Sequence, residues 1–189
     1  MKKLVVFFAF IITTASFVAC GILLNAKRLS QCSFVLSDVK NFSLASIKLD
    51  NISNIKQIGS ADMLKILAAL ASKNINFSFD AIIKASNPHQ KSVSLDRLDY
   101  IILLEENQLA TGSLNEKFII PAKSSDFVSV KVNINVLETI KKATIEDIFT
   151  LYQNIIGKNA QNTSLLSVKL KPTINQYTFP SYITIKKEI

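Results

Sequence analysis

The chain has 189 residues and a formal net charge of +8. Its positive mean hydropathy of +0.29, with 49% hydrophobic and only 19% charged residues, excludes a disordered or solvating polar polymer. It carries four glycines, one histidine and two cysteines. Four glycines are too few for a glycine-rich phosphate loop, and one histidine with two cysteines excludes an ordinary zinc site.

The N-terminal twenty residues have the layout of a secretory signal peptide. Two lysines precede an apolar run at residues 4–12, and mostly small residues follow before Ala19 and Cys20. A basic start, a short apolar run and small residues at the cut are typical of signals that are removed on export. We therefore predict a signal peptide over residues 1–19, with cleavage between Ala19 and Cys20.

The predicted cut lies in a segment that resembles the bacterial lipobox, Phe17-Val-Ala-Cys20-Gly21. Phe17 stands where such segments usually have leucine. The resemblance implies that the Cys20 thiol carries a diacylglyceryl group and that its new amino group is acylated with a fatty acid such as palmitate. Each buried CH₂ group contributes about 0.8 kcal/mol, so two or more acyl chains hold a protein stably on a membrane.

Two other interpretations of this segment are open. The uncharged run over residues 4–24 is long enough to span a bilayer as an uncleaved helix. Alternatively, Cys20 is an ordinary cysteine beside the cleavage site of a soluble secreted protein. Under the lipobox interpretation, Gly21 replaces the aspartate of inner-membrane retention signals. We then expect an outer-membrane lipoprotein of the cell envelope that faces the periplasm.

The first predicted elements after the cut are strands, followed by a helix. A tether covers residues 20–32. Strand-like residues then fill 33–37 and 42–49, with a turn at residues 38–41 between them. Apolar residues recur every three or four positions between residues 59 and 73, which predicts a short amphipathic helix.

The middle of the chain shows the clearest strand alternation. Odd-numbered residues from 75 to 83 are apolar and most even-numbered ones are polar, until Pro88 stops the strand. A second strand is predicted over residues 95–104. A polar hairpin turn separates it from a third strand over residues 109–120, in which Gly112 indicates a bulge or twist point.

Alternation returns further along the chain and is followed by a second helical region. Residues 128–136 alternate between apolar and polar, which predicts a half-buried antiparallel strand. Helical segments follow at residues 137–142 and 145–156. The second of them is predicted to be capped by Thr144 and closed by Gly157.

Two strands at residues 166–170 and 181–185 bring the predicted total to about seven. Short strands with hairpin turns predict an antiparallel β-sandwich rather than a parallel α/β sheet. The predicted organisation is a signal peptide at residues 1–19, a lipidated tether at 20–32 and one sandwich domain at 33–189.

Motifs in the middle of the chain occur in the order and spacing of a known family. They are Asn87-Pro88, Leu95-x-x-Leu98-x-Tyr100-x-Ile102-x-Leu104, Leu109-Ala110-x-Gly112, Ile120-Pro121-Ala122-x-Ser124 and the valine ladder from Val128. This arrangement resembles the late embryogenesis abundant type 2 (LEA type 2) domain, also called the WHy domain, most strongly over residues 75–136. Behind a lipobox, it is similar to LEA type 2 lipoproteins of Bacteroidota-type bacteria. Those proteins carry a second cysteine about a dozen residues after the first, as Cys32 does here.

The resemblance implies an immunoglobulin-like or fibronectin III-like sandwich, a structural or stress-protective role, and no catalytic residue. The minimal domain lacks the two helical stretches at residues 60–73 and 137–156. We expect these stretches to cap the sandwich or to form a groove. Cys32 is expected to pack in the interior, with an intermolecular disulfide as the alternative.

The candidate catalytic groups form no constellation in the sequence. His89 is the single imidazole, in a turn beside Pro88, and we expect it in a solvated loop rather than as a general base. Three pairs of acids could in principle form the two-carboxylate site of a glycosidase, but each pair is expected to have a local structural role instead. Asp96 and Asp99 are expected on a strand face, Glu105 and Glu106 at a hairpin tip, and Glu146 and Asp147 at a helix start. Eight phenylalanines are expected in the core: Phe34, Phe42, Phe77, Phe79, Phe118, Phe127, Phe149 and Phe179.

The charge pattern bears on partners. Cleavage after residue 19 removes two lysines and no acid, which leaves +6 on the mature chain. The basic residues are scattered as singles and pairs, so we expect no nucleic-acid partner. A basic exported domain is instead attracted to anionic lipid headgroups. The expected partners are the membrane, through the acyl anchor, and a protein or hydrophobic ligand of unknown identity.

These observations predict a non-enzymatic, lipid-anchored envelope protein without cofactor or metal, acting as a binding or structural module. The alternative is a carrier that holds a lipid or another hydrophobic ligand in a cleft between the sandwich and the helices. Such a carrier requires an apolar cavity above roughly 300 Å³ beneath residues 63–71 or 145–156. Cys20 is the predicted lipidation site, and no ligand-binding residue is assigned.

Overall fold

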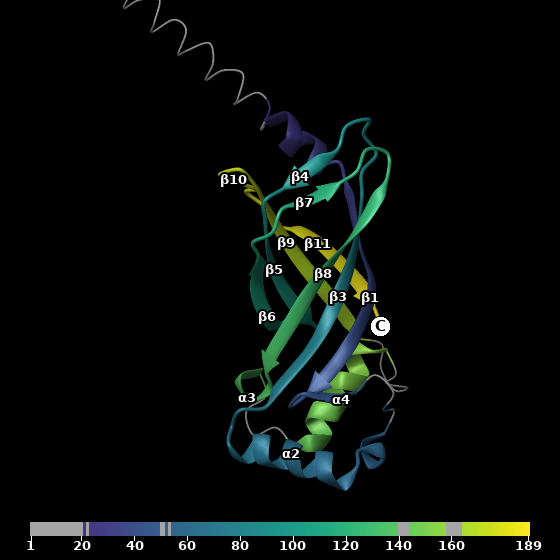
Figure 1. Cartoon of the computed structure of the whole chain (residues 1–189), viewed down its shortest axis with the longest axis vertical. Helices are drawn as coiled ribbons and strands as arrows, with labels where there is room; N and C mark the ends of the chain where they lie inside the picture. Colours follow the sequence, from purple (N-terminus) through teal and green to yellow (C-terminus); the bar gives the residue numbers. More distant parts are fainter. Residues whose placement is uncertain (1–20, 22, 50–51, 53, 140–143, 158–163) are drawn as a thin grey trace, which may run out of the picture.

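Two antiparallel β-sheets packed face to face form the body of the protein (Figure 1). The computed structural model describes residues 21, 23–49, 52, 54–139, 144–157 and 164–189. In this part of the chain, the first sheet contains, in order, β2 (Ile47–Lys48), β1 (Ser33–Leu44), β3 (Asn76–Ser86) and β8 (Ser125–Asn135). The second contains β10 (Tyr177–Thr178), β9 (Leu165–Ile174), β5 (Arg97–Leu104) and β6 (Asn107–Leu114), and β11 (Ile183–Glu188) also pairs with β9. The predicted antiparallel β-sandwich is confirmed.

The two ends of the sandwich carry different elements (Figure 1). At one end, β4 (Val93–Leu95) and β7 (Phe118–Ile120) form a separate two-stranded ribbon. The other end carries the helical elements η1 (Ile55–Gln57), α2 (Ser60–Ala71), α3 (Val136–Thr139) and α4 (Ile145–Ile155). We call these the ribbon end and the helical end.

Alternating side chains of β3 and β8 build half of the core. The two strands pair without a register shift, from Asn76 opposite Asn135 to Ser86 opposite Ser125. Every second residue of both strands is buried: Phe77, Phe79, Ala81, Ile83 and Ala85 in β3, and Val128, Val130, Val132 and Ile134 in β8. Each Å² of apolar surface removed from water stabilises the fold by about 25 cal/mol. The face that carries the apolar residues therefore turns toward the core, and the alternation fixes which face that is. The two strands predicted here are confirmed.

β1 is one long strand where the sequence predicted two. It pairs with β3 along its length, and the pairing shifts register at residues 36–38 and again at 40–43. Asn41 has a φ of 57°, and its side-chain amide donates a hydrogen bond to Asp80 Oδ2 at 2.6 Å. The predicted turn at residues 38–41 is wrong because turn-forming residues also suit β-bulges, which bend a strand without ending its ladder.

Asp96 divides the strand that was predicted over residues 95–104. Its N–H donates to Thr173 O at 2.8 Å, and its carboxylate accepts the Asn175 N–H at 2.6 Å. The chain before Asp96 pairs with β7 as β4, and the chain after it continues in the second sheet as β5. The strand predicted over residues 109–120 is divided as well, into β6 and β7. The ribbon arises from these two divisions.

Gly112 lies in regular pairing opposite Tyr100, so the predicted bulge at this glycine is wrong. The β5–β6 register shift falls between Ile102 and Leu103 instead. A Cβ atom on Gly112 would overlap the Tyr100 side chain, whose hydroxyl donates to Lys131 O at 3.0 Å. Glycine is needed here because the Tyr100 ring lies across it and connects the second sheet to β8.

α2 confirms the helix predicted between residues 59 and 73, but part of its apolar surface faces solvent. Ile66 is fully buried, whereas Leu64 is 67% exposed and Leu67 is 44% exposed. Asp62 and Lys65 form an ion pair at 2.8 Å on the surface of the helix. The helix is therefore apolar on its inner face and on part of its outer face.

α4 closes the helical end with an apolar face that packs on the core. Thr144 Oγ1 accepts the Asp147 N–H at 3.2 Å, and the Asp147 carboxylate accepts the Thr144 N–H at 2.8 Å, as the predicted cap requires. Gly157, with a φ of 67°, follows the helix as predicted. The buried residues of α4 are Ile148, Phe149, Leu151, Tyr152 and Ile155. This face packs on the hydrophobic core.

The segment predicted as a tether is attached to the domain. Residues 23–29 are helical, and Leu29 is fully buried. The Asn25 side chain donates to Ser94 O at 2.8 Å and accepts the Ser94 N–H at 3.4 Å. These contacts fix the N-terminal helix to β4. Within the described residues, no helix has the length and apolarity needed to cross a membrane.

Candidate functional site

The predicted lipidation site, Cys20, and the preceding Ala19 lie outside the described residues. The described chain begins beside them, with the helix at residues 23–29 fixed to the ribbon through Asn25 and Ser94. The ribbon end is therefore the end of the sandwich closest to Cys20 along the chain. Two of the features that could bind a partner, an apolar cavity and a polar cluster, lie in this half of the molecule.

An apolar cavity of about 250 Å³ opens at the ribbon end, beside the edge of β8. Its apolar wall comes from both sheets and from the ribbon: Leu95, Leu98, Leu114, Phe118 and Val128. Glu116, Lys117 and Ser129 supply polar groups, and Phe127 lies at the same site with 55% of its surface exposed. An apolar wall with a few polar groups is typical of sites for hydrophobic ligands.

Phe127 is the residue of this site that the sequence prediction misplaced. It was expected in the core with the other phenylalanines, but it is exposed. The prediction is right for Phe42, Phe77, Phe79, Phe149 and Phe179, which are buried, whereas Phe34 and Phe118 are partly buried. The missed signal was the alternation of the strand. Phe127 is an odd-numbered residue of β8 and shares the outward face with Ser129, whereas the even-numbered Val128 faces the core.

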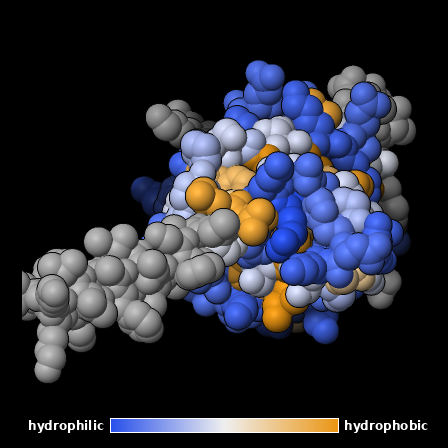
Figure 2. Space-filling view, turned by 90° about the horizontal axis from the view of Figure 1, so that it is seen from above, coloured by the Kyte–Doolittle hydropathy of each residue, from blue (hydrophilic) through white to orange (hydrophobic). Residues whose placement is uncertain are grey.

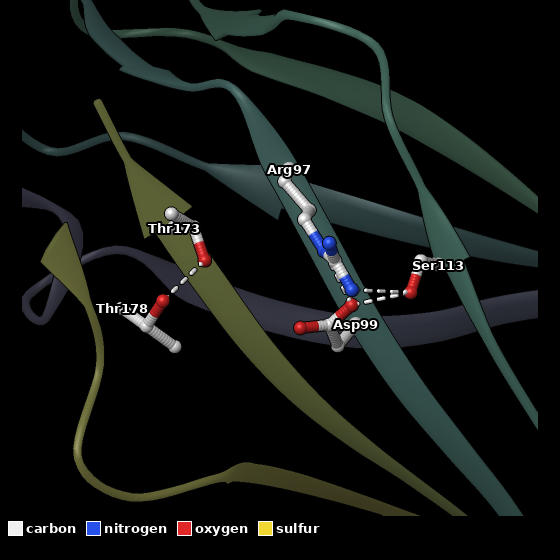
Figure 3. A network of polar contacts seen from close by, with 5 residues as sticks. All are labelled: Arg97, Asp99, Ser113, Thr173 and Thr178. Carbon is white, nitrogen blue, oxygen red and sulfur yellow. Dashed lines mark hydrogen bonds and ion pairs between the residues drawn. The ribbon is translucent and has the colours of Figure 1, made fainter. Parts of the chain in front are cut away.

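A polar cluster lies on the outer face of the second sheet (Figure 3). Arg97 Nε donates to Asp99 Oδ1 at 2.8 Å, and Arg97 Nη2 donates to Ser113 Oγ at 3.1 Å. The Ser113 hydroxyl also donates to Asp99 Oδ1. Next to this triad, the hydroxyls of Thr173 and Thr178 form a hydrogen bond of 2.9 Å between β9 and β10. The cluster connects neighbouring strands through their outward side chains.

Asp99 is held as an anion by this cluster. Burial raises the pKa of Asp99, but hydrogen bonds from Ser113 and Arg97, with the charges of Arg97 and Lys171, bring the pKa below its ordinary value. A carboxyl with a lowered pKa stabilises the fold above its unfolded pKa, and this contribution is lost as pH falls through the folded value. Such a group suits an ion pair better than proton donation.

The other acids that the sequence singled out serve the structure locally. Glu105 Oε1 accepts the Leu165 N–H at 2.6 Å at the β5–β6 hairpin, and Asp96 accepts the Asn175 N–H at the β4–β5 break. Hydrogen bonds from the Thr144 backbone and hydroxyl lower the pKa of Asp147. Glu106 and Glu146 are exposed. Among the described residues, no three His, Cys, Asp or Glu side chains gather where they could hold a metal ion.

The loop after β3 is organised by Asn87. This side chain is 3% exposed, and its Oδ1 accepts the His89 N–H at 3.0 Å. Its amide group donates to three backbone carbonyls, those of Lys91, Ile120 and Pro121, at 2.9, 3.2 and 3.0 Å. Asn87 therefore ties the end of β3 to the end of β7. The sequence indicated it as a strand stop, not as this junction.

His89 is less exposed than the sequence analysis expected. The residue is partly buried, and its Nε2 atom has no hydrogen-bond partner among the described residues. Ser86, one of the hydroxyls near it in sequence, forms a 2.7 Å hydrogen bond with Ser125 Oγ across β3 and β8. The expectation of a solvated loop residue is corrected to a partly packed one.

Cys32 is partly buried and forms no disulfide within the described part of the chain. Its Sγ atom donates to Arg28 O at 3.4 Å. Burial raises the pKa of its thiol, which lowers the thiolate fraction at neutral pH. An intermolecular disulfide through Cys32 stays a prediction.

Comparison with known proteins finds partial structural similarities. No protein-family model and no curated protein matches the chain. A crystal structure of a protein from Archaeoglobus fulgidus is 14% identical, with 60% of this chain and 84% of that chain covered and a TM-score of 0.37. A solution structure of an Arabidopsis thaliana protein is 15% identical, with 60% and 70% covered and a TM-score of 0.38. The solution structure of a candidate late embryogenesis abundant (LEA) protein is 15% identical, with 99% and 87% covered and a TM-score of 0.36.

Proposed function

We propose that the mature chain is a non-enzymatic, lipid-anchored module of the bacterial cell envelope that binds a partner or reinforces a structure. The observation that carries this proposal is the lipobox-like segment around Cys20, followed within a few residues by a helix fixed to the sandwich through Asn25 and Ser94. A diacylated and N-acylated Cys20 would hold the domain stably on a membrane. We place it on the periplasmic face of the outer membrane, since Gly21 stands where a retention aspartate would be.

The roles of the ionisable side chains support a function other than catalysis. Asp99 is neutralised by Arg97, and the carboxylates of Asp96, Glu105 and Asp147 accept backbone N–H groups. Each of these groups already has a structural task on a different element of the fold. A catalytic acid or base instead needs access to a substrate and a pKa suited to proton transfer.

Metabolic labelling tests the anchor. Cells that express the chain are grown with an alkyne fatty acid, and the purified protein is examined for incorporated label. We expect label on the wild type and on Cys32→Ala, which removes the other cysteine, and none on Cys20→Ala. Equal labelling of Cys20→Ala would contradict the proposed anchor.

A second candidate function, binding of a small hydrophobic ligand, is favoured by the cavity beside Leu98 and Leu114. Its volume of about 250 Å³ is below the roughly 300 Å³ that a lipid carrier requires, so the ligand is smaller than a whole lipid. Such a ligand was predicted between the sandwich and the helices, whereas this cavity lies at the opposite end of the sandwich. We therefore assign the ligand to the ribbon end. Native mass spectrometry of protein extracted from its membrane tests this assignment. Leu114→Phe fills the cavity and should lower the bound fraction of a short acyl-chain ligand about tenfold or more. Leu64→Phe, on exposed α2, should leave binding unchanged, and equal binding by both variants would contradict the assignment.

A further inference from the structure

The surface of the ribbon end combines exposed apolar side chains with basic ones. Leu23 is 61% exposed, Leu24 is 46% exposed and Ile119 is 49% exposed. Ile119 lies opposite Ser94 in the β4–β7 pairing, and Ser94 is the residue that binds Asn25. Leu24 and Ile119 therefore flank the same junction. Figure 2, which looks onto this end, shows apolar side chains gathered near the middle of the face with hydrophilic ones around them.

Basic residues outnumber acids at the ribbon end. Two acids border it, Asp96 directly after β4 and Asp126 at the start of β8. The described segments around the ribbon, residues 23–31, 87–92, 115–117 and 121–124, contain one acid, Glu116. They contain five basic residues: Lys27, Arg28, Lys91, Lys117 and Lys123. Each Lys or Arg close to an anionic lipid surface contributes about 1 kcal/mol of attraction. We call this set of five, together with Leu23, Leu24 and Ile119, the ribbon-end surface.

The position of the ribbon-end surface matches that of the proposed anchor. Asn25 is five residues after Cys20, and a fully extended chain covers about 3.4 Å per residue, so Cys20 reaches at most about 17 Å from Asn25. Asn25 is itself bonded to the ribbon. The anchor is therefore too short to let the domain float free of the membrane.

We infer that the ribbon-end surface lies on the anionic headgroups of the bilayer that holds the acyl anchor, with Leu23, Leu24 and Ile119 at the level of the acyl-chain boundary. The inference rests on the proposed anchor at Cys20. Amphipathic surfaces bind at this depth when apolar groups are surrounded by Lys and Arg, whose long stems reach along the apolar region while their charges stay among the headgroups. The sandwich then stands upright, with α2 pointing away from that membrane.

Tryptophan fluorescence can test this orientation because the chain contains no tryptophan. The mature lipidated protein is extracted from its membrane and reconstituted into vesicles of phosphatidylethanolamine and phosphatidylglycerol, with or without bromine on the acyl chains. Ile119→Trp and Leu24→Trp each place an indole on the ribbon-end surface. Leu64→Trp is the matched control, because Leu64 is an exposed leucine at the helical end.

We expect brominated lipid to lower the emission of Ile119→Trp and Leu24→Trp about twofold or more and to leave that of Leu64→Trp unchanged. In the double variant Lys91→Glu and Lys123→Glu, the quenching of Ile119→Trp should weaken. Protein that floats with the vesicles but shows no quenching at positions 24 and 119 would overturn the inference and leave the anchor intact. Equal quenching at positions 64 and 119 would also overturn it. Protein that neither floats nor takes up fatty-acid label would overturn both the anchor and the inference.

Discussion

Replacing Tyr152 with alanine is expected to lower the free energy of unfolding by about 3–5 kcal/mol. The ring is 2% exposed and packs edge-on against Phe42 at 5.2 Å between centroids, with Phe149 at 5.4 Å. Its hydroxyl donates to Leu49 O at 2.8 Å. Truncation leaves a cavity between α4 and the first sheet and removes the partner of a buried carbonyl. The loss combines both effects.

Equilibrium urea unfolding, followed by near-ultraviolet circular dichroism, measures this change. Tyr152→Phe keeps the ring and removes the hydroxyl, so it should cost about 1–2 kcal/mol and separate the two contributions. Tyr182→Ala removes a tyrosine that is 44% exposed and should change the free energy by at most about 1 kcal/mol. Unfolding of Tyr152→Ala at the urea concentration of the wild type would show that α4 does not help to hold the sandwich together.

Asn87→Ala is expected to lower the free energy of unfolding by about 2–3 kcal/mol, although the residue lies in a loop. The side chain makes four hydrogen bonds, three to carbonyls and one from the His89 N–H, and it is 3% exposed. Alanine supplies none of these, and the carbonyl of Ile120, a fully buried residue, loses this donor. The ribbon should loosen because Ile120 belongs to β7.

Urea unfolding gives the size of the Asn87→Ala effect, and amide hydrogen exchange gives its location. Exchange should accelerate in β4 and β7 more than in β3 and β8. Asn87→Asp replaces the donating amide with an oxygen that faces carbonyls, so it should not restore stability. Asn107→Ala, an exposed hairpin asparagine, should change the free energy by at most about 0.5 kcal/mol. An Asn87→Ala variant as stable as Asn107→Ala would contradict the role given to this junction.

Elements whose signals are local could be predicted. The alternation of β3 and β8 follows from the period of two residues in a strand, which separates a buried face from an exposed one. α4 was predicted together with its cap because Thr144 and Asp147 have the spacing of a capping box. The pair of turn residues after β5 ended that strand as expected, at Glu105 and Glu106, both with positive φ.

Elements whose form depends on a distant partner could not be predicted. Asn41 reads as a turn residue, but β3 continues beside it, so the chain makes a bulge and continues as β1. Gly112 reads as a kink, but it is needed to make room for Tyr100. Tyr100 lies twelve residues away on the neighbouring strand.

The candidate site divides in the same way. The lipobox-like segment around Cys20 is a contiguous motif and needs no fold to be recognised, whereas the cavity combines residues of five strands, β4 to β8, spread over residues 95–129. Leu98 and Leu114 meet Val128 only because β5, β6 and β8 converge near the ribbon. Phe127 was predicted in the core because it is hydrophobic, although its odd-numbered position in β8 places it on the outward face.

By itself, the sequence determined the class of the fold and the sides of the strands that face the core. These two features depend on residues within one or two turns or strand repeats of each other, so local physical chemistry decides them. The anchor at Cys20 stays a prediction from a resemblance. Only the tertiary structure decided that residues 23–29 are bound to the ribbon, that α2 exposes leucines, and that basic and apolar groups gather at one end. Such features arise when segments distant in sequence are brought together, and a pattern read along one strand or helix does not contain that information.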